Sequence, residues 1–143
     1  MKPFRIALLV GIVAVIAGGV GALKALASEN RALGTTVRVT EQEMKVTASV
    51  KRVPAGKVTF IVRNTGTVEH ELVVLRYSGK PGSLPVKNFK AAEDEDAVIG
   101  EAEDLKPGKS TALTLNLKPG RYLLLCNIVA HYQLGMRTSL LVG

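Results

Sequence analysis

The stretch KVTFIVRN, residues 57–64, alternates apolar and polar side chains. Val58, Phe60 and Val62 fall on one face of an extended chain, which is the period of a half-buried β-strand. Proline, glycine and asparagine bound the stretch on both sides and supply turn conformations. This segment therefore predicts one strand of an all-β domain.

Similar segments recur along the chain at short intervals, separated by Pro-Gly and Asn-x-Gly turns. β-branched residues are frequent and tryptophan is absent, so Val, Leu and Ile must fill the core. We predict a Greek-key β-sandwich over residues 35–143. Its strands are expected at residues 35–40, 44–51, 57–63, 71–77, 110–117, 121–126 and 136–142.

The strand pattern lapses between residues 78 and 106. A short helix is expected near residues 91–97. Residues 93–104 carry seven carboxylates, and such a run usually forms a solvated connection. A docking patch for a basic partner, or weak cation binding, is the functional alternative. The spacing does not match an EF-hand loop.

The N-terminus has a basic start, an uncharged apolar stretch at residues 6–23 and the small-x-small sequence Ala25-Leu26-Ala27. We interpret residues 1–27 as a signal peptide, or as an uncleaved membrane-anchor helix that attaches the protein through residues 6–23. Residues 28–34 form a linker. Either interpretation predicts a periplasmic or otherwise exported domain, with the anchored form facing outside the cytoplasm.

The formal net charge of +7 is spread along the chain without a Lys/Arg-rich run interleaved with aromatics, which argues against nucleic-acid binding. Cys126 is the only cysteine. In an oxidising compartment it can form no intramolecular disulfide, and an exposed thiol would be oxidised. Cys126 is therefore expected to be buried or bound to a metal.

Cys126, His131 and Met136 stand five residues apart. This spacing converges on neither a helix face nor a strand face, so a loop must bring the three side chains together. The other histidine, His70, opens a predicted strand at the same end of the sandwich. Each residue alone is better explained by ordinary packing. Together they form a His₂Cys set with a weak methionine, which suits blue copper better than zinc or an iron–sulfur cluster.

These motifs resemble the cupredoxins, the small blue (type 1) copper proteins. Asn64, Gly66 and His70 give N-x-G-x-x-x-H, and a Tyr/Leu-rich strand runs into C-x₄-H-x₄-M, with a spacing nearest that of rusticyanin-like members. The resemblance covers residues 35–143. It implies one copper ion, Cu(I)/Cu(II), with three equatorial ligands and one axial ligand: His70, Cys126, His131 and, axially, Met136.

One position departs from the family pattern. Many members have a small polar residue after the first histidine, where it links the two ligand segments by a hydrogen bond. This chain has Glu71 there, and Asn127 follows the cysteine. We expect Asn127 to provide the link.

A site with four protein ligands leaves no position for substrate, so we predict a monomeric one-electron carrier and not an enzyme. Two histidines are too few for a multicopper oxidase. In the family, the second histidine reaches the surface through an apolar docking patch, which here would be formed by Ile128, Val129, Tyr132 and Leu134. Extracytoplasmic copper binding, delivery or tolerance is the alternative function, although Met1 and Met44 form no Met-rich tract. A metal-free interaction domain is the third.

Overall fold

The computed structural model describes residues 34–143. The predicted signal or anchor segment and all but the last residue of the predicted linker lie outside the described residues. Within residues 34–143 no helix has the length and apolar character needed to cross a membrane.

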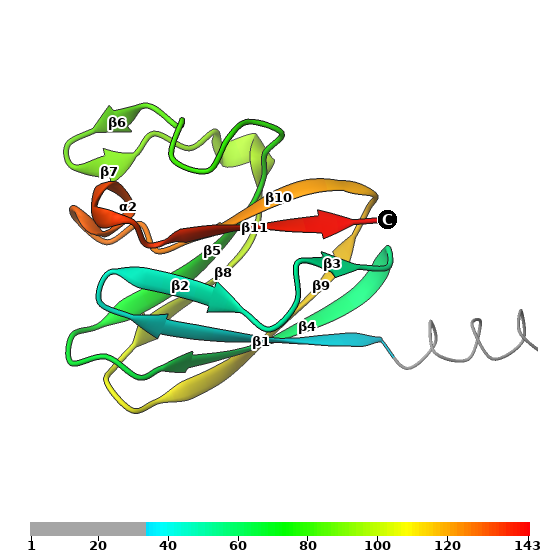
Figure 1. Cartoon of the computed structure of the whole chain (residues 1–143), viewed down its shortest axis with the longest axis horizontal. Coiled ribbons are helices and arrows are strands. Elements are labelled where there is room, and N and C mark those ends of the chain that lie inside the picture. The colour runs from blue at the N-terminus through cyan, green and yellow to red at the C-terminus, as the bar shows by residue number, and fades with distance from the viewer. Residues whose placement is uncertain (1–33) are drawn as a thin grey trace, which may run out of the picture.

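Two β-sheets pack face to face (Figure 1). The four-stranded sheet has the order β2-β1-β4-β9, and the five-stranded sheet has the order β3-β11-β10-β5-β8. Neighbouring strands are antiparallel except for the parallel pairs β1–β4 and β3–β11. The Greek-key sandwich predicted from the sequence is confirmed. The strands are β1 (Thr35–Gln42), β2 (Lys45–Ala48), β3 (Arg52–Val53), β4 (Gly56–Asn64), β5 (His70–Arg76), β8 (Val98–Leu105), β9 (Ser110–Leu117), β10 (Gly120–Leu125) and β11 (Arg137–Val142).

The main core lies between the sheets and follows from the alternation in the strands. In β4, Val58, Phe60 and Val62 are fully buried, as their spacing predicts. Leu72 and Val74 of β5 face them from the other sheet and belong to the same cluster. Aliphatic side chains therefore supply most of this core, and their burial drives the two sheets together.

The single strand predicted at residues 44–51 is wrong, because the chain changes sheets within it. β2 pairs with β1 in the four-stranded sheet, and β3 pairs with β11 in the five-stranded sheet. Ser49 N–H donates to the carbonyl of Arg38, whereas the carbonyl of Lys51 accepts from Leu141 N–H. The hydrogen-bonding partner thus changes from one sheet to the other between Ser49 and Lys51.

The predicted loop between residues 78 and 106 is also wrong in part. β8 forms an edge strand on β5, and its outward positions hold Glu101 and Glu103 while Ala102 and Leu105 pack inward. Carboxylates on the outer face hid the period-two pattern. The helix expected at residues 91–97 is reduced to the 3₁₀ turn η1 (Glu95–Ala97), capped by Asp94.

A small hairpin, β6 (Val86–Lys87) and β7 (Lys90–Ala91), lies within the excursion between β5 and β8. Val73, Leu125 and Tyr132 form a second buried cluster with Ala91 of β7 on the outer face of the five-stranded sheet. The N–H of Ala130 also donates to the carbonyl of Phe89 at 2.7 Å. The hairpin is thereby fixed beside the loop that carries the predicted ligands (Figure 1).

Candidate metal centre

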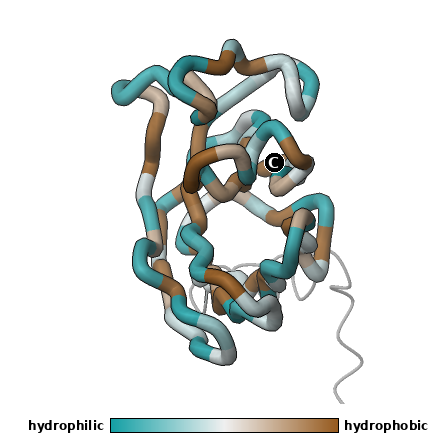
Figure 2. The backbone as a smooth tube through the Cα atoms, turned by 90° about the vertical axis from the view of Figure 1, so that its left-hand side faces the viewer, coloured by the Kyte–Doolittle hydropathy of each residue, from teal (hydrophilic) through white to brown (hydrophobic). Residues whose placement is uncertain are grey.

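His70 and Cys126 lie at the same end of the sandwich because of how β5 and β10 pair. The strands are antiparallel, with Leu125 opposite Val73, so β5 begins where β10 ends. His70 is the first residue of β5, and Cys126 directly follows β10. Both side chains are completely buried. Figure 2 looks onto this end, where hydrophilic and hydrophobic loop segments alternate.

The Asn64-x-Gly66 turn fixes the approach to His70. Nδ2 of buried Asn64 donates to the carbonyls of Val68 and Leu105, each at 2.7 Å, and Oδ1 accepts from Gly66 N–H at 2.8 Å. A Cβ on Gly66 would lie 2.5 Å from the carboxylate oxygens of Glu43. The asparagine of the motif therefore has a structural role in this chain, because its side chain holds the turn before His70.

The segment from Cys126 to Met136 folds back on itself around one helical turn, α2 (His131–Leu134). Cys126 N–H donates to the carbonyl of Met136 at 3.1 Å, and Met136 N–H donates to the carbonyl of His131 at 3.0 Å. Gly135 ends the turn at φ 120°, a backbone conformation that favours glycine. These bonds bring three residues spaced five apart to one place, as predicted.

Three possible metal-donor atoms, two imidazole nitrogens and one sulfur, lie close together at this end of the sandwich. Nδ1 of His70 lies 3.3 Å from Nδ1 of His131, and Sγ of Cys126 lies 3.9 Å and 3.3 Å from these two atoms. Among the described residues, these three form the one cluster of histidine, cysteine or carboxylate donor atoms that lie close enough together to hold a metal ion. The fourth predicted ligand, Met136, is also fully buried and shares the core cluster with Cys126.

This arrangement fits a metal ion. A point equidistant from the three atoms lies about 2 Å from each, close to a metal–imidazole bond length. Burial lowers the pKa of His70 and His131, which keeps their nitrogens neutral. Burial also raises the pKa of Cys126 to about 12, so without a cation the thiol stays protonated. A soft ion would replace that proton.

The residues that follow the two predicted ligands are joined, but not as expected. Backbone N–H of Asn127 donates to Oε1 of Glu71 at 3.1 Å, and backbone N–H of Glu71 points to Sγ of Cys126 at 3.5 Å. The side chain of Glu71 thus makes the link that was expected of Asn127, which contributes only its main-chain N–H. The side chain of Asn127 instead forms hydrogen bonds with the backbone of Ala91 and with Oε1 of Glu93. These bonds tie the loop of residues 126–136 to the segment between β5 and β8.

Two carboxylates near the centre were not identified from the sequence. Oε1 of Glu43 lies 3.5 Å from Nε2 of His70 and accepts from the N–H groups of Thr67 and Val68 at 2.6 and 2.8 Å. Those backbone bonds lower the pKa of Glu43 to about 2.

Glu41 is fully buried on β1, without a hydrogen-bond partner for either oxygen. Burial, followed by the charge of Glu71, raises its pKa to about 8. In the sequence, the one sign that Glu41 is buried is its position on the inward face of β1, in line with Val37 and Val39.

The predicted docking residues do not share one environment. Val129 and Leu134 are 56% and 59% exposed. Ile128 packs partly against the main core. Tyr132 is buried, and its hydroxyl accepts from Leu84 N–H at 3.0 Å, so its assignment to a contact surface is wrong. Tyrosine at this position holds the excursion against the loop.

A sandwich with this buried nitrogen and sulfur set defines a class of small metal-binding proteins. The family model of the cupredoxin-like domain matches residues 11–142, and the chain belongs to that family. Cupredoxins bind one copper ion, and in this chain His70, Cys126, His131 and Met136 cluster as the candidate site. No curated protein matches the sequence.

Solved structures support the assignment. Auracyanin of Roseiflexus castenholzii is 25% identical with a TM-score of 0.57, covering 77% of this chain and 98% of its own. Auracyanin A of Chloroflexus aurantiacus, described as a "blue" copper protein, is 20% identical with a TM-score of 0.56 and coverages of 77% and 99%. Rusticyanin of Thiobacillus ferrooxidans is 19% identical with a TM-score of 0.56 and coverages of 77% and 79%. The similarities to auracyanin A and to rusticyanin concern the fold alone.

Proposed function

We propose that this protein is a one-electron carrier with a mononuclear type 1 copper site, which His70, Cys126, His131 and Met136 would hold. The observation that carries the proposal is the convergence of two imidazole nitrogens and a thiol within 3.9 Å in a buried position. When bound, copper supplies a Cu(II)/Cu(I) couple, and a thiolate with two imidazoles is the ligand set of blue-copper electron transfer.

The protein's part is to hold the ligands still and keep water out. His70, Cys126 and Met136 are fully buried, so the surroundings need little reorganisation when the charge of the site changes. Backbone bonds from Met136 to His131 and from Cys126 to Met136 restrain three of the proposed ligands. With four protein ligands there is no place for a substrate, which favours electron transfer over catalysis.

His131 is the proposed ligand nearest the surface, with 8% of its area exposed. Around it stand Val129 and Leu134, together with Phe89 of the adjoining hairpin, which is 67% exposed. We assign these three residues to a docking surface for redox proteins. An exposed apolar cluster of this kind often marks a partner site. A monomer with one such surface can accept and release an electron through His131.

The cellular setting that we propose is outside the cytoplasm, in the periplasm or attached to the membrane through residues 6–23. The basis is the composition of residues 1–27 together with a lone cysteine that is completely buried. Similarity to an auracyanin whose structure was determined in a dithionite-reduced state supports a reversible redox role.

Redox cycling with a competing ligand tests this function against copper delivery. The copper-loaded full chain is reduced with ascorbate and oxidised with ferricyanide in the presence of a Cu(I) chelator, while the visible spectrum is recorded. A carrier regains its absorption band over repeated cycles and keeps its copper. Loss of copper to the chelator on the first reduction would contradict electron transfer and favour delivery. Cys126→Ser, which lacks the thiolate, is the control.

A further inference from the structure

A second site lies on the outer face of the five-stranded sheet. A cleft of about 330 Å³ is lined by residues of β10 and β11, by Lys51 before β3, and by the segment that follows β5. Arg121 stands five residues before Cys126 along β10, so the cleft is displaced along the sheet from the proposed metal ligands. Nothing in the proposed electron-transfer function accounts for it.

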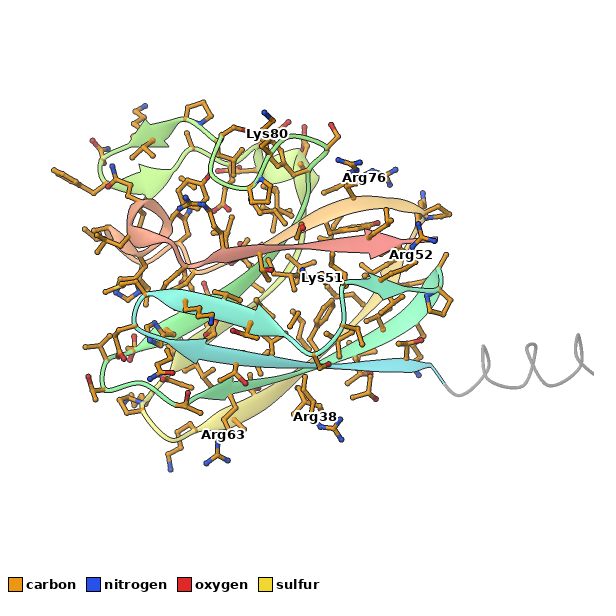
Figure 3. All side chains as sticks on the ribbon, in the orientation of Figure 1. Arg38, Lys51, Arg52, Arg63, Arg76 and Lys80 are labelled. Atoms are coloured by element: carbon orange, nitrogen blue, oxygen red, sulfur yellow. The ribbon has the colours of Figure 1, made fainter. Side chains whose placement is uncertain are left out.

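Three cations converge on this cleft: Lys51, Lys80 and Arg121. No carboxylate lines it, and within residues 34–143 no carboxylate lies at ion-pair distance from Lys51, Lys80 or Arg121, so none of these cations is neutralised by a neighbour. Figure 3 shows Lys51 and Lys80 on opposite sides of the β10–β11 pair. Like charges gathered around a concave surface repel one another and raise the local concentration of anions.

Backbone hydrogen bonds fix the main chain from which each of these side chains extends. The carbonyl of Lys51 accepts from Leu141 N–H at 2.9 Å, and the carbonyl of Arg121 accepts from Tyr77 N–H at 3.0 Å. Lys80 stands in a turn in which its own carbonyl accepts from both the N–H and the hydroxyl of Ser83. The hydroxyl of Tyr77 forms a hydrogen bond of 2.7 Å with the same Ser83 hydroxyl. The wall that carries Lys80 is therefore formed before a ligand arrives, which reduces the entropy cost of binding.

The lining of the cleft is chemically mixed. Leu123 and Leu141 contribute apolar side chains to it, and Tyr77 and Ser139 contribute hydroxyl groups. A volume of about 330 Å³ is within the range of small-molecule sites, and it is too small to take in a folded partner. The site therefore suits a compact molecule with one charged and one apolar end.

We propose that this cleft binds a small organic anion, whose phosphate or carboxylate group contacts Lys51, Lys80 and Arg121 and whose apolar part packs against Leu141. The assignment does not depend on copper. It can fail while the redox function stands, and the reverse also holds.

A titration of the ¹⁵N-labelled full chain tests this site. The probes are phenyl phosphate, benzoate and the neutral benzyl alcohol, at constant ionic strength. Phenyl phosphate should shift the backbone signals of Lys51, Lys80 and Arg121 along a saturating curve, and benzyl alcohol should not. Comparable binding of benzoate would identify a carboxylate ligand, whereas a clear preference for phenyl phosphate would identify a phosphate.

Charge-removing variants supply the matched comparison. Arg121→Gln and Lys80→Gln should each weaken phenyl phosphate binding about tenfold, because each removes a charge-assisted hydrogen bond. Lys109→Gln, an exposed change in the β8–β9 loop, should alter it less than about twofold. Non-saturating shifts, or equal weakening by Lys109→Gln, would overturn the proposal. Binding of hexaglutamate without binding of either aromatic anion would overturn it in favour of an acidic protein partner.

Discussion

Oε1 of Glu43 lies 3.5 Å from Nε2 of His70, on the side of the imidazole away from the nitrogen that faces Cys126. The carboxylate is held by the N–H groups of Thr67 and Val68, and these bonds lower its pKa to about 2. It therefore carries a negative charge at neutral pH. His70 Nε2 makes no hydrogen bond within the described residues, so the carboxylate would act on the ring through its charge, which increases the basicity of the imidazole.

Replacing this carboxylate should weaken the metal site. In Glu43→Gln the charge beside His70 is lost, and we expect Cu(II) affinity to fall about tenfold. If Cu(I) affinity is unchanged, the reduction potential rises by about 60 mV. Competition titrations and voltammetry measure the two effects. A variant at Glu69, which is exposed next to His70 in the sequence, is the control. A potential equal to that of the wild type would contradict the role given to Glu43.

Copper binding should depend on pH through the thiol of Cys126. Its pKa is raised to about 12 by burial, so near neutral pH a bound cation must displace one proton, whereas His70 and His131, with lowered pKa, are already neutral. Apparent Cu(II) affinity should rise about tenfold for each pH unit between pH 7 and 9. In Cys126→Ser this slope should disappear. A pH-independent affinity in the wild type would rule out the displaced proton.

Glu41 should make the fold less stable as the pH rises. Its pKa is raised to about 8 in the folded state, above the value of an exposed glutamate, so the folded state holds a proton that the unfolded state has released. The free energy of unfolding should fall between about pH 4.5 and pH 8, by at most about 5 kcal/mol from this group, and level off above. Urea unfolding of the copper-free protein measures the slope. Glu41→Gln should flatten it, and the exposed Glu103→Gln should not; equal slopes in both variants would contradict the assignment.

Asn64 should contribute strongly to stability. Its side chain makes three hydrogen bonds, to Val68, Leu105 and Gly66, from a fully buried position. Asn64→Ala leaves the two carbonyls and the N–H without these partners, and we expect a loss of about 2–4 kcal/mol in the free energy of unfolding. Chemical denaturation checks this. A loss below 0.5 kcal/mol would show that the turn before His70 holds without the asparagine.

Met136→Leu separates packing from coordination. The two side chains have similar volumes, so the free energy of unfolding should change by less than about 1.5 kcal/mol. The reduction potential should nevertheless rise, because an axial thioether tunes the copper couple. Voltammetry and denaturation on the same variant test both statements. An unchanged potential would mean that Met136 only fills the core.

Much of this structure could be predicted because strand alternation and ligand spacing are local properties. The burial of Val58, Phe60 and Val62 follows from a period of two, and the approach of His70 to Cys126 follows from the pairing of adjacent strands. β8 was missed because Glu101 and Glu103 on its outer face resemble a solvated run. Tyr132 was misplaced because only the excursion between β5 and β8, whose path the sequence does not specify, buries it.

The electron spin resonance and visible spectra of the full chain with one equivalent of Cu(II), beside those of Cys126→Ser, test the central claim most directly. Convergence of His70, His131 and Cys126 predicts an intense thiolate-to-copper band and a compressed copper hyperfine splitting, both absent from the variant. A pale, weakly bound copper spectrum that Cys126→Ser leaves unchanged would contradict a type 1 site at these residues.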